Sequence, residues 1–205
     1  MAIYLIRHTT PLVPKGTCYG QADVDVTDSF LKEAEAIKAH YPKHIDTVFS
    51  SPLIRCKKLA DYVAAPLNII TDPRIKEINC GDWELQKWDN IPRAETEPWM
   101  QDFVNVPFKN GENYISLQSR TVAFFNQYFN ANKNIAVFTH AGVKRSILAY
   151  ISNVALIDSF KHFNIPYGSI TKIFKDANNN FAYTTIYAKE FPTELHRPSY
   201  MKIPK

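Results

Sequence analysis

The chain has 205 residues, of which 45% are hydrophobic and 21% are charged, and its formal net charge is +4. This composition excludes a low-complexity or strongly disordered chain, which would carry fewer apolar residues and more net charge. A protein of 23.5 kDa buries roughly 70% of its unfolded surface on folding, enough for one sizeable core without disulfides. We therefore expect a single domain that spans residues 1–205.

Charge and cysteine content limit the classes of partner and compartment. The net charge is small and no block of Lys and Arg occurs, so no nucleic-acid partner is expected. The three cysteines are an odd number without a C-x-x-C pair, which argues against a disulfide framework and a structural zinc site. No apolar run has the length of a membrane span, and the amino terminus does not resemble a signal peptide. We expect a cytoplasmic protein with no membrane partner.

The first part of the chain alternates strand and helix patterns. The run Ala2–Ile6 is continuously apolar, which is typical of a strand buried in a parallel sheet. Ser51 followed by Pro52 has the pattern of a helix N-cap and first helical residue. Strands are thus predicted at 2–6, 47–49 and 67–71, and helices at 27–41 and from Ser51 to near Pro66.

Residues 81–113 interrupt this alternation. They contain all three tryptophans and are too long for an ordinary connection, so we predict a partly helical lid insertion. The alternation then resumes, with helices predicted at 114–129 and 143–151, strands at 135–139, 169–174 and 181–187, and an extended tail at about 190–205. This pattern predicts an α/β fold, a three-layer α/β/α sandwich with a mostly parallel central sheet.

Basic residues and histidines follow three of the predicted strands. Arg7 and His8 come directly after the first strand, His140 follows the strand 135–139, and Arg55 lies in the first turn of the second helix. In open α/β sheets, ligands bind beyond the carboxyl ends of the strands, and a helix N-terminus favours anions. Arginine donates two parallel hydrogen bonds to phosphate, and neutral imidazole is a nucleophile. The sequence therefore predicts a phosphate site at this edge.

Five short segments resemble the motifs of the histidine phosphatase (phosphoglycerate mutase-like) superfamily. Each motif alone is weak evidence for the family. Five motifs in the family's order and spacing, spread over residues 2 to about 175, are specific evidence for it. The segments are Leu5–Thr10, Ser50–Arg55, Ile75–Glu84, Asn110–Glu112 with Arg120, and Thr139–Val143. Within the superfamily, Cys18–Gln21 and Gly81–Glu84 are most similar to the α-ribazole phosphatase branch.

The resemblance implies a phosphomonoesterase that works through a phosphohistidine, with no cofactor and no metal. By position, His8 would be the nucleophile, and Arg7, Arg55 and His140 would hold the phosphoryl oxygens, His140 being counted with the catalytic residues. Glu77 would protonate the leaving oxygen and then activate water. Phosphoryl transfer needs mainly positioning and neutralised oxygens, and a covalent intermediate divides it into two easier steps.

The chain departs from the family pattern next to the nucleophile. Thr9 replaces the usual glycine, Thr10 replaces the usual acidic or amide residue, and Pro14 falls about where a phosphate-binding asparagine is usual. We expect Thr9, Thr10 or Gln21 to supply the missing phosphate contact. Lys144 and Arg145, which open the helix after His140, are expected to be solvated.

The branch implies that the substrate is α-ribazole 5′-phosphate, which loses its phosphate late in cobalamin assembly. The lid tryptophans would then stack on the benzimidazole base, or would only pack the lid. Alternatives are a broad-specificity phosphatase, a phosphoglycerate mutase of the same superfamily, or a non-catalytic sensor of a phosphate ligand. The sequence does not decide among these substrates, and it does not indicate the oligomeric state.

Overall fold

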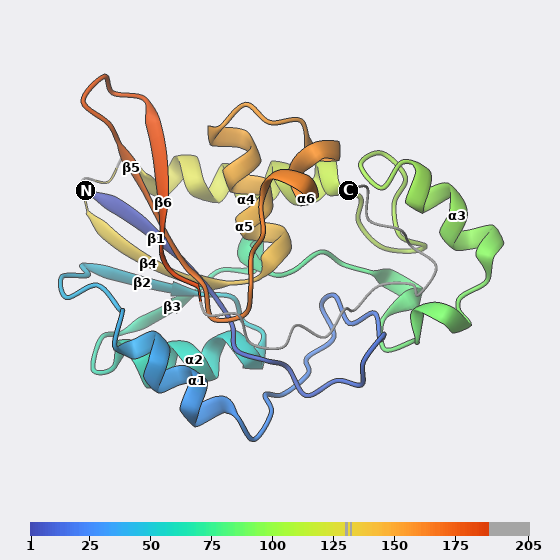
Figure 1. Ribbon diagram of the computed structural model, residues 1–205, viewed down its shortest axis with the longest axis horizontal. Coiled ribbons are helices and arrows are strands. Elements are labelled where there is room, and N and C mark those ends of the chain that lie inside the picture. The colour runs from blue at the N-terminus through green and yellow to red at the C-terminus, as the bar shows by residue number, and fades with distance from the viewer. Residues whose placement is uncertain (130, 132, 189–205) are drawn as a thin grey trace.

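A six-stranded sheet forms the centre of the molecule, with the strand order β3-β2-β4-β1-β5-β6 (Figure 1). In this computed structural model, which describes residues 1–129, 131 and 133–188, the tail predicted at about 190–205 lies outside the described residues. The strands are β1 (Ala2–Arg7), β2 (Thr47–Ser50), β3 (Ile69–Thr71), β4 (Asn134–Thr139), β5 (Ile170–Lys175) and β6 (Phe181–Tyr187). The four strands β1 to β4 pair in parallel, and β5 and β6 are antiparallel. The predicted fold class is confirmed.

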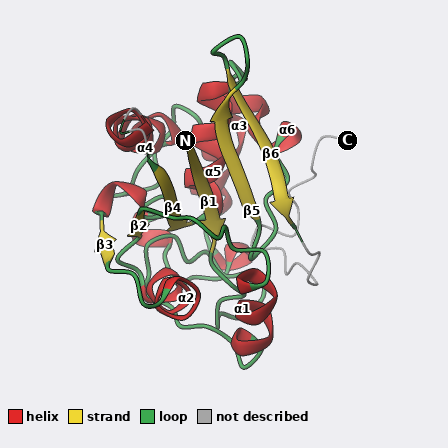
Figure 2. Cartoon of the chain, turned by 90° about the vertical axis from the view of Figure 1, so that its left-hand side faces the viewer, coloured by secondary structure: helices red, strands yellow, loops and turns green. Residues whose placement is uncertain are grey.

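Helices cover both faces of this sheet (Figure 2). The pair α1 and α2 lies on one face, and α4 and α5 lie on the other, so that the molecule has three layers. The helices are α1 (Phe30–Lys38), α2 (Ile54–Ala64), α3 (Arg93–Gln101), α4 (Tyr114–Phe129), α5 (Ala141–Ile151) and α6 (Ser159–His162). In the described ranges, none of them is both long enough and apolar enough to cross a membrane.

The core is divided by the sheet because successive strand side chains point to opposite faces. Leu5 belongs to the larger core, with Phe124 of α4 and Val143 of α5. Its neighbour Ile6 belongs to the smaller core, with Leu59 of α2. Both cores bury β1 completely at these two positions, which explains why the strand is apolar without alternation.

The insertion predicted at 81–113 is partly helical, as expected. It contains α3 and short 3-10 turns at Gly81–Trp83 and Trp88–Asn90, and it lies beyond the end of the sheet away from the β5–β6 turn (Figure 1). Trp83, Trp88 and Trp99 are 2%, 6% and 7% exposed. Their ring centroids lie 5.5 to 5.8 Å apart, mostly edge to face. The tryptophans therefore pack against one another and form the core of this insertion.

Several predicted boundaries differ from the structure. The helix α2 begins at Ile54 with Leu53 as its N-cap, so the prediction that Ser51 caps this helix is wrong. The Ser51 hydroxyl accepts from the backbone N–H of Leu53 at 3.3 Å and also lies 2.8 Å from His140 Nε2, on a segment that is distant in the sequence. The first helix begins at Phe30 rather than at residue 27, and β3 begins at Ile69 rather than at residue 67. Helix α4 has the predicted bounds.

Candidate active site

The ends of β1 and β4 bring the two predicted histidines together. These strands are parallel neighbours, and Arg7 pairs with Thr139 in their register. His8 and His140 are the next residues of each strand, and their ring centroids lie 5.1 Å apart, edge to face. The backbone N–H of His8 donates to the carbonyl of Thr139 at 3.1 Å. The expectation that both histidines lie at one edge of the sheet is thus met.

The His8 imidazole is held in one tautomer. Its Nδ1 lies 2.7 Å from the carbonyl oxygen of Thr9, and the residue is only 1% exposed. A carbonyl oxygen only accepts, so Nδ1 carries the proton. In the neutral ring the lone pair is then on Nε2. A phosphorus atom would be attacked by this nitrogen.

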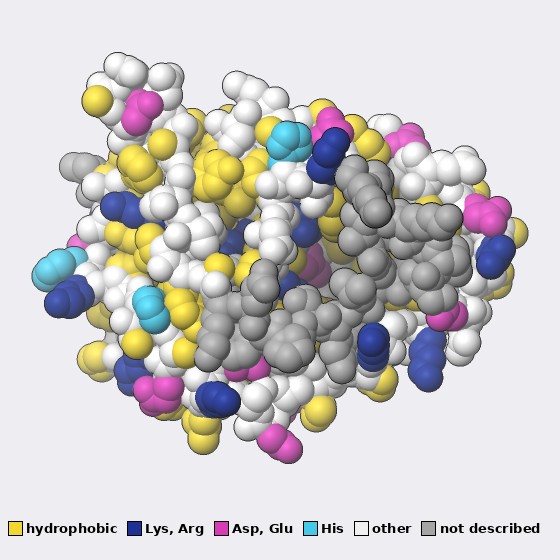
Figure 3. Space-filling view, viewed as in Figure 1, with side chains coloured by type: hydrophobic (Ala, Val, Ile, Leu, Met, Phe, Trp, Pro, Cys, Tyr) yellow, Lys and Arg dark blue, Asp and Glu magenta, His cyan; other side chains and the backbone are white. Residues whose placement is uncertain are grey.

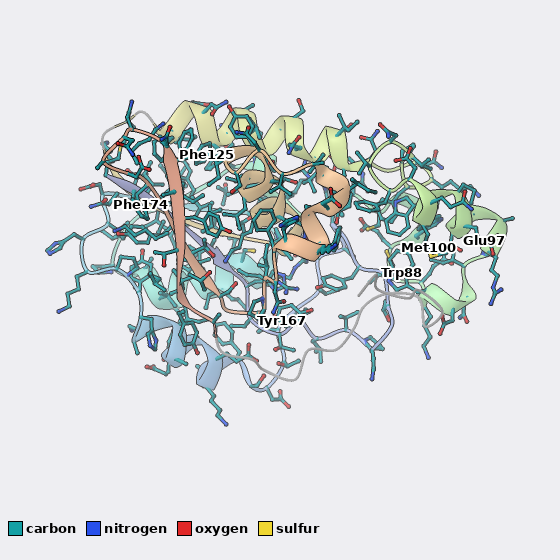
Figure 4. The ribbon with its side chains drawn as sticks, turned by 45° about the horizontal axis from the view of Figure 1, so that its top comes forward. Trp88, Glu97, Met100, Phe125, Tyr167 and Phe174 are labelled. Atoms are coloured by element: carbon teal, nitrogen blue, oxygen red, sulfur yellow. The ribbon has the colours of Figure 1, made fainter. Side chains whose placement is uncertain are left out.

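Arg7 is fixed beside the His8 ring by the segment before β5. Its Nη1 donates to the carbonyl of Ile165 at 2.6 Å, and its guanidinium carbon lies 3.7 Å from the ring centroid of Tyr167. The Tyr167 ring is also 5.5 Å from the His8 ring. Figure 4 shows Tyr167 in the middle of the molecule, between the sheet and the insertion that carries Trp88. The Nε of Arg7 is buried and has no hydrogen-bond partner among the described residues.

Arg55 reaches the same edge from the first turn of α2. Its Nη1 and Nη2 donate to the carbonyls of Ala22 and Gly20, both at 2.8 Å, and the side chain is completely buried. Gly20 has φ +33°, and a Cβ there would lie 2.7 Å from the sulfur of Cys80, so glycine is required at this turn. As at Arg7, the Arg55 Nε is buried without a partner in the described chain. A phosphoryl oxygen is the kind of acceptor that such donors lack.

His140 is completely buried beside helix α2. Its Nε2 lies 2.8 Å from the Ser51 hydroxyl and 3.4 Å from the sulfur of Cys56. Burial lowers its pKa well below 6.5, and the positive charge of Arg55 lowers the pKa further. We therefore expect a neutral imidazole near pH 7. Sequence reasoning missed Ser51 and Cys56 as neighbours of His140, because they are distant in the chain and nothing local marks the contact.

The Glu77 carboxylate lies at the amino end of α5, next to His140. Its Oε2 accepts from the backbone N–H of Gly142 at 3.2 Å, and its Oε1 accepts from the N–H of Ile78 at 2.9 Å. A Cβ at position 142 would lie 2.2 Å from the Glu77 Oε1, so only glycine admits the carboxylate there. Glu77 is therefore not a freely solvated loop residue.

The three residues expected to supply the missing phosphate contact, Thr9, Thr10 and Gln21, have different surroundings. Thr9 is completely buried beside His8, and its hydroxyl has no partner within the described residues. The Gln21 side-chain amide instead donates to the carbonyl of Glu77 at 2.9 Å. The backbone N–H of Thr10 donates to Glu33 of α1 at 2.9 Å. Phosphate binding by Thr9 and Gln21 stays a prediction.

Lys144 is not solvated, so that prediction is wrong. It is completely buried, and its Nζ lies 2.8 Å from the carbonyl and 2.9 Å from the hydroxyl of Ser169. Burial lowers the pKa of Lys144 well below 10.5, and the charge of Arg7 adds to this effect. Its neighbour Arg145 is partly exposed, with its guanidinium carbon 3.9 Å from the ring centroid of Phe160. The helix turns residue 144 inward, which its charge alone did not indicate.

Basic and acidic side chains are visible near the centre of one face, between hydrophobic and uncharged ones (Figure 3). Over the described ranges, no group of three or more His, Cys, Asp or Glu side chains has an arrangement that would hold a metal ion. The geometry is that of a compact cluster of cationic side chains and histidines, with a nucleophilic nitrogen on His8 and a carboxylate on Glu77.

Comparison with known proteins gives one family and several relatives. The family model of the histidine phosphatase superfamily, branch 1, matches residues 3–185. Phosphoserine phosphatase 1 of Hydrogenobacter thermophilus is 25% identical over 207 residues, which cover 95% of this chain and 98% of that protein. Solved structures of phosphatases share the fold. An α-ribazole-5′-phosphate phosphatase candidate of Escherichia coli has a TM-score of 0.82 and 22% identity, covering 95% of this chain and 99% of that one. The α-ribazole phosphatase of Shigella flexneri has a TM-score of 0.81 and 19% identity, covering 98% and 100%.

Proposed function

The chain belongs to the histidine phosphatase superfamily (branch 1), and from this membership and the geometry of the site we propose that it is a phosphomonoesterase with a phosphohistidine intermediate. The observation that carries the proposal is the fixed tautomer of His8 beside the two guanidinium groups of Arg7 and Arg55. A pocket that only sensed phosphate would need the cations, but it would not need a nucleophilic nitrogen or the Glu77 carboxylate.

In the first step the phosphoryl group lies among Arg7, Arg55 and His140, with the bond to the leaving oxygen in line with His8. The Nε2 lone pair of His8 forms the N–P bond as the P–O bond breaks. The proton of the Glu77 carboxyl group passes to the leaving oxygen, so an alcohol departs rather than an alkoxide. The guanidinium groups neutralise the phosphoryl oxygens throughout this step.

In the second step water attacks the phosphorus of phosphohistidine. The Glu77 carboxylate takes a proton from the water, the N–P bond breaks, and the electron pair returns to His8 Nε2. Inorganic phosphate leaves, and both residues regain their starting protonation states. A mutase would instead return the phosphoryl group to a bound alcohol.

The test is to trap the intermediate. Incubation with a phosphorus-labelled phosphomonoester and denaturation in alkaline detergent should give an alkali-stable, acid-labile phosphoprotein, which His8→Ala lacks. Turnover should be unaffected by EDTA, because the proposed chemistry uses no metal. Full activity of the His8→Ala variant, or loss of activity with EDTA, would overturn the proposal. Tight binding of a phosphomonoester without turnover would favour the sensor.

For the substrate, we propose α-ribazole 5′-phosphate, which the motifs Cys18–Gln21 and Gly81–Glu84 support. A second candidate is phosphoserine, because a phosphoserine phosphatase is similar over nearly the whole chain. A panel of α-ribazole 5′-phosphate, phosphoserine, 3-phosphoglycerate and sugar phosphates separates them by kcat/KM. Rates within tenfold across the panel would indicate a broad-specificity phosphatase. Isomerised phosphoglycerate would indicate a mutase.

We also propose that residues 81–113 act as a lid on a single domain, and that the protein works in the cytoplasm, where its three free cysteines stay reduced. Because the tryptophans are buried in the insertion, the lid would contact a substrate through other side chains. Protease protection of this insertion by a bound phosphomonoester would support the lid. Equal cleavage with and without ligand would contradict it.

A further inference from the structure

Arg120 binds the loop that carries Glu77 through both terminal nitrogens of its guanidinium group. Its Nη1 donates to the carbonyls of Arg74 and Lys76 at 2.6 and 2.7 Å, and its Nη2 donates to the carbonyl of Glu77 at 2.8 Å. The same Nη2 and the Nε donate to the Glu112 carboxylate at 2.9 and 2.8 Å. One guanidinium of α4 thus binds three backbone carbonyls within four residues.

Glu112 orients this guanidinium and also binds the same loop. Its Oε2 accepts from the backbone N–H of Asn79 at 2.9 Å, two residues after Glu77. Burial alone would raise the pKa of Glu112, but the hydrogen bonds and charge of Arg120 bring this pKa below its usual value. Glu112 therefore stays negatively charged near neutral pH. Together, Arg120 and Glu112 bind the chain on both sides of the Glu77 side chain.

The Glu77 carboxylate has its own, separate supports. It accepts from the backbone N–H groups of Ile78 and Gly142, and neither contact involves Arg120. The hydrogen bonds of Arg120 and Glu112 fix the position of the backbone at Glu77, and these two N–H groups fix the position of its carboxylate. A shift of the backbone would therefore move the carboxylate relative to Gly142 and to the leaving oxygen.

We propose that Arg120 is a positioning residue for the general acid, which holds the backbone of Glu77 so that its carboxyl group reaches the leaving oxygen. The inference rests on the proposed function, because it assumes that Glu77 protonates the leaving group. Arg120 itself touches neither His8 nor the arginines of the pocket in any hydrogen bond that the structure shows within the described residues. Its loss should therefore impair the proton transfer rather than the binding of the phosphoryl group.

Substrates with different leaving groups distinguish a defect in proton transfer from a defect in binding of the phosphoryl group. p-Nitrophenolate leaves without protonation, whereas the alkoxide of β-glycerophosphate must be protonated as it leaves. The value of kcat/KM reports only the steps up to phosphoryl transfer, so hydrolysis of the phosphohistidine does not affect it. We would measure kcat/KM with both substrates for the wild type, Glu77→Gln, Arg120→Lys and Arg74→Lys.

Arg74→Lys is the matched control. Arg74 also forms a forked ion pair, with Asp72 at 2.6 Å, and its Nη1 binds Gln127. It lies in the same loop as Glu77, but its guanidinium makes no contact with Glu77. Arg120→Lys keeps the positive charge and removes the fork, which one ammonium group does not replace.

We expect Arg120→Lys to lower kcat/KM for β-glycerophosphate by about 10- to 100-fold, as a displacement of about 1 Å can do, and for p-nitrophenyl phosphate by less than about threefold. Arg74→Lys should leave kcat/KM for both substrates unchanged. Equal losses with the two substrates, or no loss, would overturn the inference. If Glu77→Gln itself shows no difference between the substrates, the proposed role of Glu77 fails instead.

A second variant covers the case in which Arg120→Lys does not fold. Glu112→Gln keeps one oxygen acceptor, which can still bind Arg120 Nη2 and the N–H of Asn79, and it loses the negative charge and the acceptor for Arg120 Nε. Thermal unfolding would confirm that this variant is folded. Its kcat/KM for β-glycerophosphate should fall by a smaller factor than that of Arg120→Lys, and its kcat/KM for p-nitrophenyl phosphate should not change. A folded Glu112→Gln variant with the wild-type ratio of the two kcat/KM values would contradict the inference.

Discussion

The Glu77 carboxylate accepts a hydrogen bond from the backbone N–H of Gly142 at 3.2 Å, which joins the loop after β3 to the first turn of α5. The N-terminal N–H groups of a helix have no partners within the helix, and the helix dipole favours a negative charge there. Because His140 directly precedes α5, the same helix places the proposed general acid beside the histidine that we propose to bind phosphate.

Removal of the proposed general acid Glu77 should lower the rate more for a substrate with a poor leaving group than for one with a good leaving group. Glu77→Gln keeps the size of the side chain but has no proton to give, so turnover of an alkyl phosphate should fall by roughly 10²–10⁴-fold. Steady-state kinetics with β-glycerophosphate measures this loss, and p-nitrophenyl phosphate is the control. An unchanged kcat/KM with the alkyl phosphate would remove Glu77 from the mechanism.

Gly142→Ala should displace the Glu77 carboxylate without altering any functional group of the site. The new Cβ would lie 2.2 Å from the Glu77 Oε1, so the side chain has to move. Gly142 lies in the first turn of α5, and alanine is a better helix former than glycine, so helix propensity does not predict unfolding. We expect at least about a tenfold loss of kcat/KM for β-glycerophosphate, by the same displacement argument as for Arg120. Ser146→Ala, on the same helix, is the control and should retain wild-type kinetics; equal activity of both variants would contradict the steric argument.

The buried His140 should make the protein less stable in mild acid. Its folded pKa lies well below 6.5, first because of burial, so below about pH 6.5 the unfolded chain binds a proton that the folded chain does not. The free energy of unfolding should therefore fall by up to about 1.4 kcal/mol per pH unit from this group as the pH drops below that value. Urea unfolding from pH 7.5 to 5 measures this slope. His140→Asn should have a shallower slope, and an identical slope would show that another group causes the effect.

Tyr167 should support Arg7 through its ring rather than through its hydroxyl. The guanidinium lies 3.7 Å from the ring centroid, whereas the hydroxyl lies 3.1 Å from that of Tyr19. A cation–π contact of about 1–2 kcal/mol corresponds to roughly 5- to 30-fold in affinity. Tyr167→Leu should thus raise the Kd of inorganic phosphate by this factor, measured by calorimetry. Tyr167→Phe is the matched control with near wild-type affinity, and an equal loss of affinity in the Phe and Leu variants would assign the role to the hydroxyl.

Much of the fold and the central site could be predicted from local patterns. The apolar runs before His8 and His140 indicated buried parallel strands, and the carboxyl ends of parallel strands meet at one edge of a sheet. That rule is enough to bring the two histidines and Arg7 together, and Arg55 follows from the helix after β2. These predictions depend on backbone direction alone, which periodicity and strand order determine.

Only the tertiary structure decided which side chains support that site. Lys144 is a charged residue in a helix pattern, yet it is buried against Ser169, because the rotation of α5 depends on packing against the sheet. Gln21 and Arg120 were visible in the sequence as polar residues of the motifs, but their acceptors are backbone carbonyls of the Glu77 loop. Every residue has such a carbonyl, so no residue type identifies the one that is bound. Local sequence patterns thus determine the direction of the backbone at the site. The long-range hydrogen bonds depend on how the folded elements pack, so no local pattern predicts them.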